Sequence, residues 1–192
     1  MRNVKDIPEI IEPRDIVVGN PNAPVTIMEF GDYESEACMQ ANEVVKELLE
    51  YYEGQVNFVF RHFPLTKVHQ RAHKAAEAAV AAGQEGKFWE MHQALFANRR
   101  NLGIISLKSY AREVGVTGKR FLEDLMNGTY GWQVQGDLQE GLKMGVRDVP
   151  HFFINNKSFD GTWSTRNVKT HINHLLQEVA SMPTVGTKRK RA

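Results

Sequence analysis

The feature that most constrains the fold is a short apolar run, between residues 25 and 30, that passes directly into a helical pattern. Val25 to Phe30 is an apolar stretch bounded by a proline and a glycine, which is typical of a buried strand. Valines and leucines then recur at helical spacing, so a helix follows the strand. Cys38, the only cysteine, falls in the first turn of that helix, where unsatisfied N–H groups favour a thiolate. This order of elements is typical of a redox site.

The segment from Phe30 to Cys38 reads Phe-Gly-Asp-Tyr-Glu-Ser-Glu-Ala-Cys. It resembles the active-site segment of the DsbA-like thioredoxin-fold thiol–disulfide oxidoreductase family, in which Asp-Tyr-Glu precedes a Cys-x-x-Cys site. Here the four site positions are Ser35-Glu36-Ala37-Cys38, so the second cysteine is retained and serine replaces the attacking one. The resemblance therefore implies that Cys38 and Ser35 occupy the catalytic positions.

Two further segments carry the same resemblance, which covers about residues 20–179. Residues 61–65, Arg-His-Phe-Pro-Leu, resemble the family's second strand where it meets the helical insertion. Residues 145–150, Gly-Val-Arg-Asp-Val-Pro, resemble its substrate-binding loop, in which the proline is cis. Three motifs in the family's order predict its fold.

The proline loop supplies the predicted substrate-binding positions. By resemblance, Val149 and Pro150 lie beside the start of the helix, at Glu36 and Ala37, and bind an extended peptide or a protein thiol or disulfide substrate. The cis bond is implied by the family alone, because X–Pro bonds in folded proteins are mostly trans. The alternative interpretation is an ordinary loop proline before a strand.

The remaining patterns predict an α/β thioredoxin fold, βαβ…ββα, with a mixed central sheet and an all-helical insertion at about residues 66–145. A second buried strand is expected at 55–62, followed by helices and then a hairpin whose strands, 151–154 and 157–159, meet at two asparagines. A closing amphipathic helix is expected at 165–180. The predicted helices of the insertion span residues 72–82, where Gly83 ends the helix, and 87–98, 106–115, 119–127 and 132–144.

The two ends of the chain are predicted to lie outside the thioredoxin-like domain, which we place at residues 25–180. Residues 1–24 resemble an arm with a short strand near 16–18 that packs along the sheet edge. Residues 181–192 have no apolar periodicity and end in a basic run at 188–191, so we expect a disordered tail.

Charge and hydropathy limit the partners and the location. Lys plus Arg number 24 and Asp plus Glu number 23, so we expect no nucleic-acid partner and no general attraction to a membrane. The first residues lack the apolar core of a secretory signal, and no run reaches the ~20 apolar residues of a membrane span. The chain as written is expected to be cytoplasmic, or extracytoplasmic if a leader has been removed. The oligomeric state cannot be inferred.

The residues around Cys38 predict weak reactivity. Asp32, Glu34 and Glu36 lie close to it in sequence, and carboxylates disfavour a thiolate. Ser35 is a favoured N-cap, whose hydroxyl is expected to accept an N–H of the first turn. No metal site is predicted: the histidines at positions 62, 69, 73 and 92 lack a recognisable ligand set, so packing and hydrogen bonding are the favoured roles.

Three functional hypotheses are left open, and with them whether the chain is an enzyme. The first is a single-cysteine thiol–disulfide oxidoreductase that needs an external thiol such as glutathione, with no resident cofactor. The second is a non-redox, peptide-binding or chaperone-like module that uses the groove at Val149 and Pro150. The third is an active dithiol oxidoreductase whose first cysteine has been replaced by Ser35.

Overall fold

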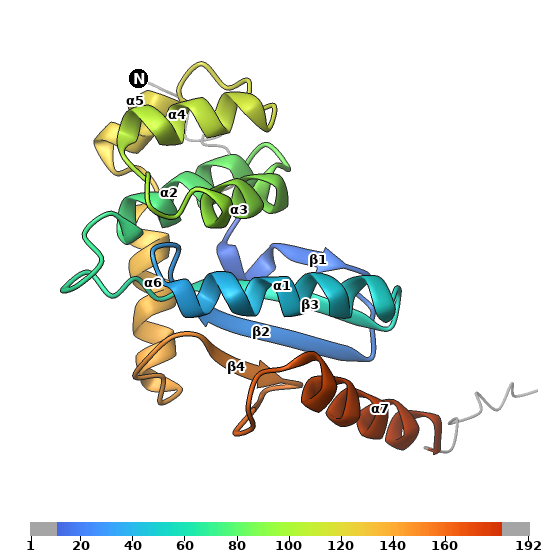
Figure 1. The fold of residues 1–192 in the computed structure, drawn as a ribbon. Helices are drawn as coiled ribbons and strands as arrows, with labels where there is room; N and C mark the ends of the chain where they lie inside the picture. Colours follow the sequence, from blue (N-terminus) through green and yellow to red (C-terminus); the bar gives the residue numbers. More distant parts are fainter. Residues whose placement is uncertain (1–10, 182–192) are drawn as a thin grey trace, which may run out of the picture.

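The computed structural model describes residues 11–181 and has a five-stranded mixed sheet at its centre (Figure 1). The strand order is β1-β3-β2-β4-β5. Strand β2 (Val25–Gly31) runs parallel to β3 (Val56–His62) and antiparallel to β4 (His151–Ile154). Helix α1 (Glu36–Tyr51) connects the parallel pair. The predicted α/β thioredoxin fold is confirmed, and the strand before the predicted site is the central strand of the sheet.

The predicted helical insertion lies between β3 and β4 in the chain, and most of its helices lie above the sheet in Figure 1. Its first two helices pack together, and its last helix packs against both the first helix and β3. The last helix therefore links the insertion to the sheet. The helices are α2 (Ala72–Gly83), α3 (Phe88–Ala97), α4 (Ile104–Glu113), α5 (Phe121–Asn127) and α6 (Gly131–Lys143).

The chain closes with a hairpin and a long helix. Asn155 and Asn156 form the turn between β4 and β5 (Lys157–Ser158), with φ values of 47° and 64°. Asparagine tolerates this left-handed conformation better than most residues do, which explains the turn. Helix α7 (Thr165–Ser181) follows and packs on α1 and β2. The predicted basic tail at 182–192 lies outside the described residues.

Part of the predicted N-terminal arm is described. A short 3-10 helix, η2 (Pro13–Asp15), leads into β1 (Val17–Gly19), which pairs antiparallel with β3 at the edge of the sheet. The prediction of an edge strand near residues 16–18 is therefore confirmed, while residues 1–10 lie outside the described part. No helix within residues 11–181 is both long and apolar enough to cross a membrane.

The prediction of a buried strand at residues 55–62 is confirmed, because all seven residues of β3 are buried. Its polar residues have partners inside the protein: Arg61 pairs with Asp137 of α6 at 2.5 Å, and Asn57 donates to the carbonyl of Asn20 at 3.0 Å. The helical insertion and the arm therefore cover the face of β3 that carries these polar side chains.

Candidate functional site

The candidate site begins where β2 ends. A Cβ atom at Gly31 would lie 2.5 Å from the ring of Phe60, so this close approach requires glycine. The chain then turns through residues 32–35 into α1, and the Ser35 hydroxyl accepts the backbone N–H of Cys38 at 3.3 Å. The predicted N-cap is confirmed. The cap fixes the first turn of the helix and, with it, the position of Cys38.

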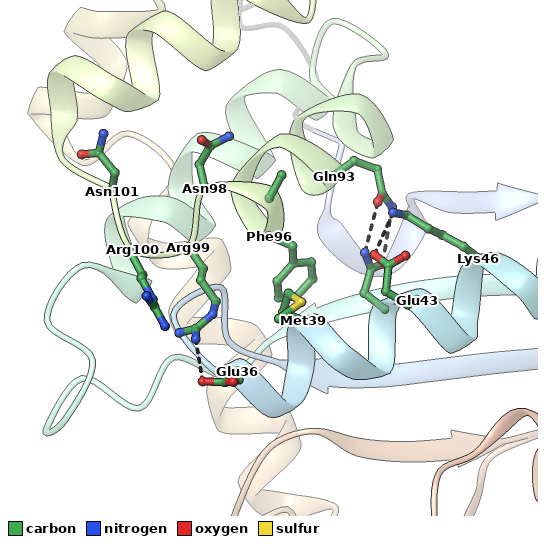
Figure 2. A pocket seen from close by; sticks show the side chains of 12 residues that line it. Glu36, Met39, Glu43, Lys46, Gln93, Phe96, Asn98, Arg99, Arg100 and Asn101 are labelled. Atoms are coloured by element: carbon green, nitrogen blue, oxygen red, sulfur yellow. Dashed lines mark hydrogen bonds and ion pairs between the residues drawn. The ribbon is translucent and has the colours of Figure 1, made fainter.

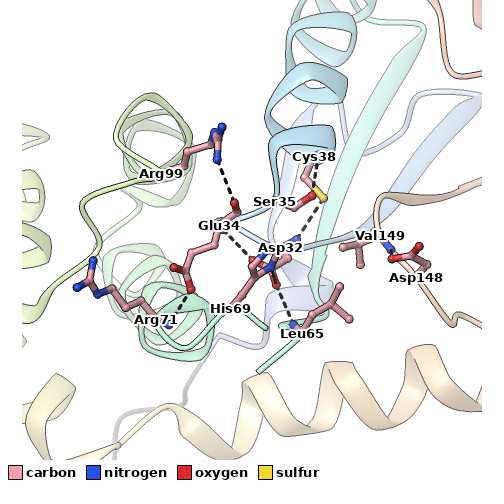
Figure 3. Close-up of polar contacts among 10 residues, drawn as sticks. All are labelled: Asp32, Glu34, Ser35, Cys38, Leu65, His69, Arg71, Arg99, Asp148 and Val149. Carbon is pink, nitrogen blue, oxygen red and sulfur yellow. Dashed lines mark hydrogen bonds and ion pairs between the residues drawn. The ribbon is translucent and has the colours of Figure 1, made fainter. Parts of the chain in front are cut away.

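Cys38 points into the protein, and its side chain is 0% exposed. Its sulfur accepts the backbone N–H of Asp32 at 3.5 Å (Figure 3). Burial raises the pKa of the thiol above its ordinary value, the negative charge of Glu29 raises it further, and the Ser35 hydroxyl partly offsets this increase. At neutral pH Cys38 is therefore a thiol, as expected for a weakly reactive cysteine.

The cause of the raised pKa of Cys38 differs from the sequence-based prediction. Of the three carboxylates expected to act on Cys38, only Asp32 contributes, and its effect is the smallest. Glu34 and Glu36 engage the insertion instead: Glu34 accepts the backbone N–H of Arg71 at 2.7 Å, and Glu36 pairs with Arg99 at 2.6 Å. Sequence proximity alone therefore misidentified the charge that matters.

Glu29 is a residue of the candidate site that sequence reasoning missed. It lies in β2 and is fully buried, and neither carboxyl oxygen makes a hydrogen bond of good geometry within the described residues. Burial raises the pKa of Glu29 well above its ordinary value, and the Cys38 thiol offsets part of that increase. A glutamate in the middle of an otherwise apolar strand is the signal that could have revealed it.

The loop of residues 32–35, which precedes Cys38, is held in place by a second buried carboxylate, that of Asp32. Its oxygens accept the backbone N–H groups of Glu34 at 2.7 Å and Leu65 at 2.8 Å, and contact Nδ1 of His69 at 2.9 Å (Figure 3). Another histidine, His92, contacts the Tyr33 hydroxyl at 3.0 Å through Nδ1. The predicted hydrogen-bonding roles of His69 and His92 are therefore confirmed.

The proline loop lies at the same end of the sheet. His151 pairs with Phe30, so Pro150 lies at the same end of the sheet as the last residues of β2. The Val149–Pro150 peptide bond is cis, and the Val149 N–H donates to the Asp148 carboxylate at 2.8 Å (Figure 3). Val149 also packs against the core cluster that contains Cys38. The fold thus brings the predicted catalytic and substrate-binding segments together.

The predicted site residues differ in their access to solvent. The residues Glu36 and Ala37 are exposed, Val149 and Pro150 are half-buried, and Ser35 and Cys38 are buried. The surface available to a partner is therefore formed by the middle of the four-residue segment and by the proline loop.

A cavity of about 510 Å³ adjoins the exposed start of α1 (Figure 2). Met39 and Phe96 supply its apolar lining. Its acidic groups are already paired, Glu36 with Arg99 at 2.6 Å and Glu43 with Lys46 at 2.9 Å. The cavity extends the exposed surface of the site towards the insertion and carries no unpaired acidic side chain.

The fold and this site define a thioredoxin-like protein of the DsbA type that has one cysteine. Residues 12–174 match the family model described as Thioredoxin, and the chain belongs to that family. BdbD from Bacillus subtilis, in its oxidised form, is 25% identical with a TM-score of 0.76, covering 86% of this chain and 93% of that one. Wolbachia pipientis alpha-DsbA1 is 19% identical with a TM-score of 0.73, covering 85% and 92%, and shares the fold. This chain is thus a member of the Thioredoxin family that has a single cysteine and shares the fold of DsbA-type structures.

Curated relatives match over a comparable stretch but are much longer. The Na(+)/H(+) antiporter NhaA 1 of Salinispora arenicola is 39% identical over 151 residues, which are 79% of this chain and 23% of the antiporter. The antiporter NhaA of Herminiimonas arsenicoxydans is 29% identical over 168 residues, 85% of this chain and 27% of that protein. This chain thus spans about a quarter of the length of these relatives.

Proposed function

We propose that this protein binds extended segments of other polypeptides at the start of α1 and the Val149–Pro150 loop, without initiating disulfide exchange. The observation that carries this proposal is the burial of Cys38, whose side chain is 0% exposed and whose pKa is raised. An accessible thiolate is what attacks a disulfide. Ser35 serves as a helix cap, and a hydroxyl does not exchange with disulfides.

The binding surface in this proposal combines backbone and side-chain recognition. An extended segment would lie along Val149 and pair with its backbone like an added edge strand. Because the Val149 N–H already donates to Asp148, we expect its carbonyl oxygen to accept from the bound segment. Side chains of that segment would pass over the exposed Ala37 and towards the cavity beside Glu36.

Binding without exchange is tested with a polypeptide that cannot react. The probe is a fluorescent insulin B chain whose cysteines have been alkylated, and the readout is fluorescence anisotropy. We expect saturable binding that Cys38→Ala leaves unchanged and that Ala37→Glu weakens at least about tenfold, because a charge replaces a small apolar contact. The matched control is Ala180→Glu, at another exposed alanine, on α7. Absence of binding, or binding that needs Cys38, would contradict the proposal.

A second candidate function is single-cysteine exchange with an external thiol, which the position of Glu29 favours. The raised pKa of this buried carboxyl group lets it hold a proton that the adjacent Cys38 sulfur can exchange as it reacts. Cys38 would form a mixed disulfide while the second substrate sulfur leaves as a thiol. A glutathione-type thiol would then attack the mixed disulfide and release Cys38. Glutathione-dependent reduction of insulin that disappears in Cys38→Ala would establish this function.

The variant Ser35→Cys separates a degenerate site from one that lacks only its first thiol. It places two thiols three residues apart at the start of α1, the spacing of the DsbA-like site. If the scaffold is otherwise intact, we expect the variant to reduce insulin in the presence of dithiothreitol, whereas the parent protein does not. A variant that folds but stays inert would favour the peptide-binding function.

A further inference from the structure

A groove of about 550 Å³ lies between α4 and α5, at the end of the insertion farthest from the sheet in Figure 1. Phe121 and Leu122 contribute apolar surface to it, while Lys108, Arg112 and Lys119 bring three positive charges. None of its lining residues is acidic. The chain as a whole has a formal net charge of only +1, so this local excess does not follow from overall composition.

The three cations have no ion-pair partner within residues 11–181. Two nearby carboxylates bind neutral donors instead. Glu113 accepts the Ser109 hydroxyl at 2.9 Å, and Glu85 accepts the backbone N–H of Thr117 at 2.9 Å. The positive charge of the groove is therefore available to a partner outside the chain, and charge complementarity requires that partner to be anionic.

An apolar side chain projects from the same helix face. Ile105 lies at the rim of the groove, is 86% exposed and precedes Lys108 by one helical turn, and its neighbour Ile104 is 41% exposed. A recessed apolar pocket can bind a side chain of a peptide. An isoleucine that projects from the surface can instead insert into a lipid layer. Projecting apolar residues next to lysine and arginine are typical of surfaces that lie at the membrane interface.

We propose that the α4–α5 end of the insertion docks on an anionic lipid surface. Lys108, Arg112 and Lys119 bind lipid phosphates, and Ile105 enters the boundary between headgroups and acyl chains. Overall charge balance predicted no attraction to membranes, but the fold gathers these cations on one end of the molecule. Docking through this end leaves the candidate site on the opposite side of α2 and α3 from the lipid (Figure 1).

The test is flotation of the full chain with vesicles of phosphatidylcholine alone or with phosphatidylglycerol added. We expect binding to the anionic vesicles only, weakening as salt increases. The double variant Lys108→Glu and Arg112→Glu should lower the partition at least about tenfold, since each basic residue near an anionic membrane contributes about fivefold. Ile105→Ser should lower it severalfold without changing the salt dependence.

The matched control is Lys157→Glu with Arg166→Glu, two exposed cations on β5 and α7. It changes net charge equally and should leave the partition within about twofold of the parent protein. All variants keep the basic run at 188–191, and circular dichroism checks their folding. Equal losses in both double variants would show general charge attraction and overturn the proposal. Failure to bind vesicles, with saturable binding of an acidic amphipathic helix, would assign the groove to a protein partner and also overturn it.

Discussion

Two buried acidic centres lie on opposite faces of the β2–β3 pair. The Glu29 centre consists of Glu29 and Cys38, on the face covered by α1. The Arg61 centre consists of Arg61, Asp137 and Glu140, on the face covered by α6. Because strand residues alternate between faces, the two centres are separated by the sheet itself.

The difference between the centres is in what surrounds each carboxyl group. Asp137 contacts the Arg61 guanidinium at 2.5 Å and accepts the His62 N–H at 2.9 Å, and burial still raises its pKa to about 6. Within residues 11–181 Glu29 has no cation or strong donor, and burial raises its pKa well above the ordinary value. A cation and a hydrogen-bond donor thus reduce the increase in the pKa that burial causes, but they do not remove it. The Arg61 centre fastens α6 to the sheet, whereas the Glu29 centre keeps a proton next to the Cys38 sulfur.

The largest expected effect comes from breaking the Arg61 centre. Asp137→Ala leaves the guanidinium of Arg61 buried without its main partner, which should lower the free energy of unfolding by about 3–5 kcal/mol. Urea denaturation measures this. The matched control is Glu140→Ala, whose carboxylate is 45% exposed and should contribute at most about 1 kcal/mol. Equal losses in the two variants would mean that burial of the pair is unimportant.

The Glu29 centre should make stability depend on pH. The pKa of Glu29 is higher in the folded state than the ordinary value of 4.5, so folding favours the protonated group. Its contribution is therefore complete below pH 4.5 and is lost as pH rises towards the folded-state pKa. We expect the parent protein to lose stability relative to Glu29→Gln as pH rises from 5 to 8. Parallel stability curves for the two proteins would refute a raised pKa at Glu29.

Removal of the helix cap should have a smaller effect. Ser35→Ala deletes the acceptor for the Cys38 N–H and should cost about 0.5–2 kcal/mol of unfolding free energy. It should also raise the pKa of Cys38 further, because the Ser35 hydroxyl lowers that pKa. Ser35→Asn retains a capping acceptor and should recover most of the stability. If asparagine fails to rescue, the loss reflects packing and not capping.

The smallest expected effect is on the pKa of Cys38, when the negative charge of Glu29 is removed. Iodoacetamide alkylation followed against pH should give a midpoint above that of free cysteine, because burial is the main cause. Glu29→Gln should lower the midpoint without bringing it to the free value. Glu34→Gln, which removes a carboxylate that binds Arg71, should leave it unchanged. A midpoint below that of free cysteine in the parent protein would refute the assignment.

Most of the fold could be predicted from sequence because its signals are local. The run before Gly31 and the two asparagines of the hairpin each identify their element without reference to distant residues. The burial of Arg61 could not be predicted in this way. Its partner Asp137 is 76 positions away, and no local pattern shows that α6 covers that face of β3.

The candidate site was predictable where it depends on motif spacing. Ser35, Cys38 and Pro150 were identified, and the register of β2 with β4 brings their segments to one end of the sheet. Glu29 was missed because a polar residue in a strand is ordinarily assigned to the exposed face. Only the packing of α1 and α7 over that face shows that its carboxyl group has no access to water.

The two edge strands, β1 and β5, are three and two residues long. Stretches this short offer too few unpaired backbone groups to hold a neighbouring molecule in register. Copies of this protein therefore gain little by pairing their sheets edge to edge, which protects a concentrated solution from fibrous aggregation.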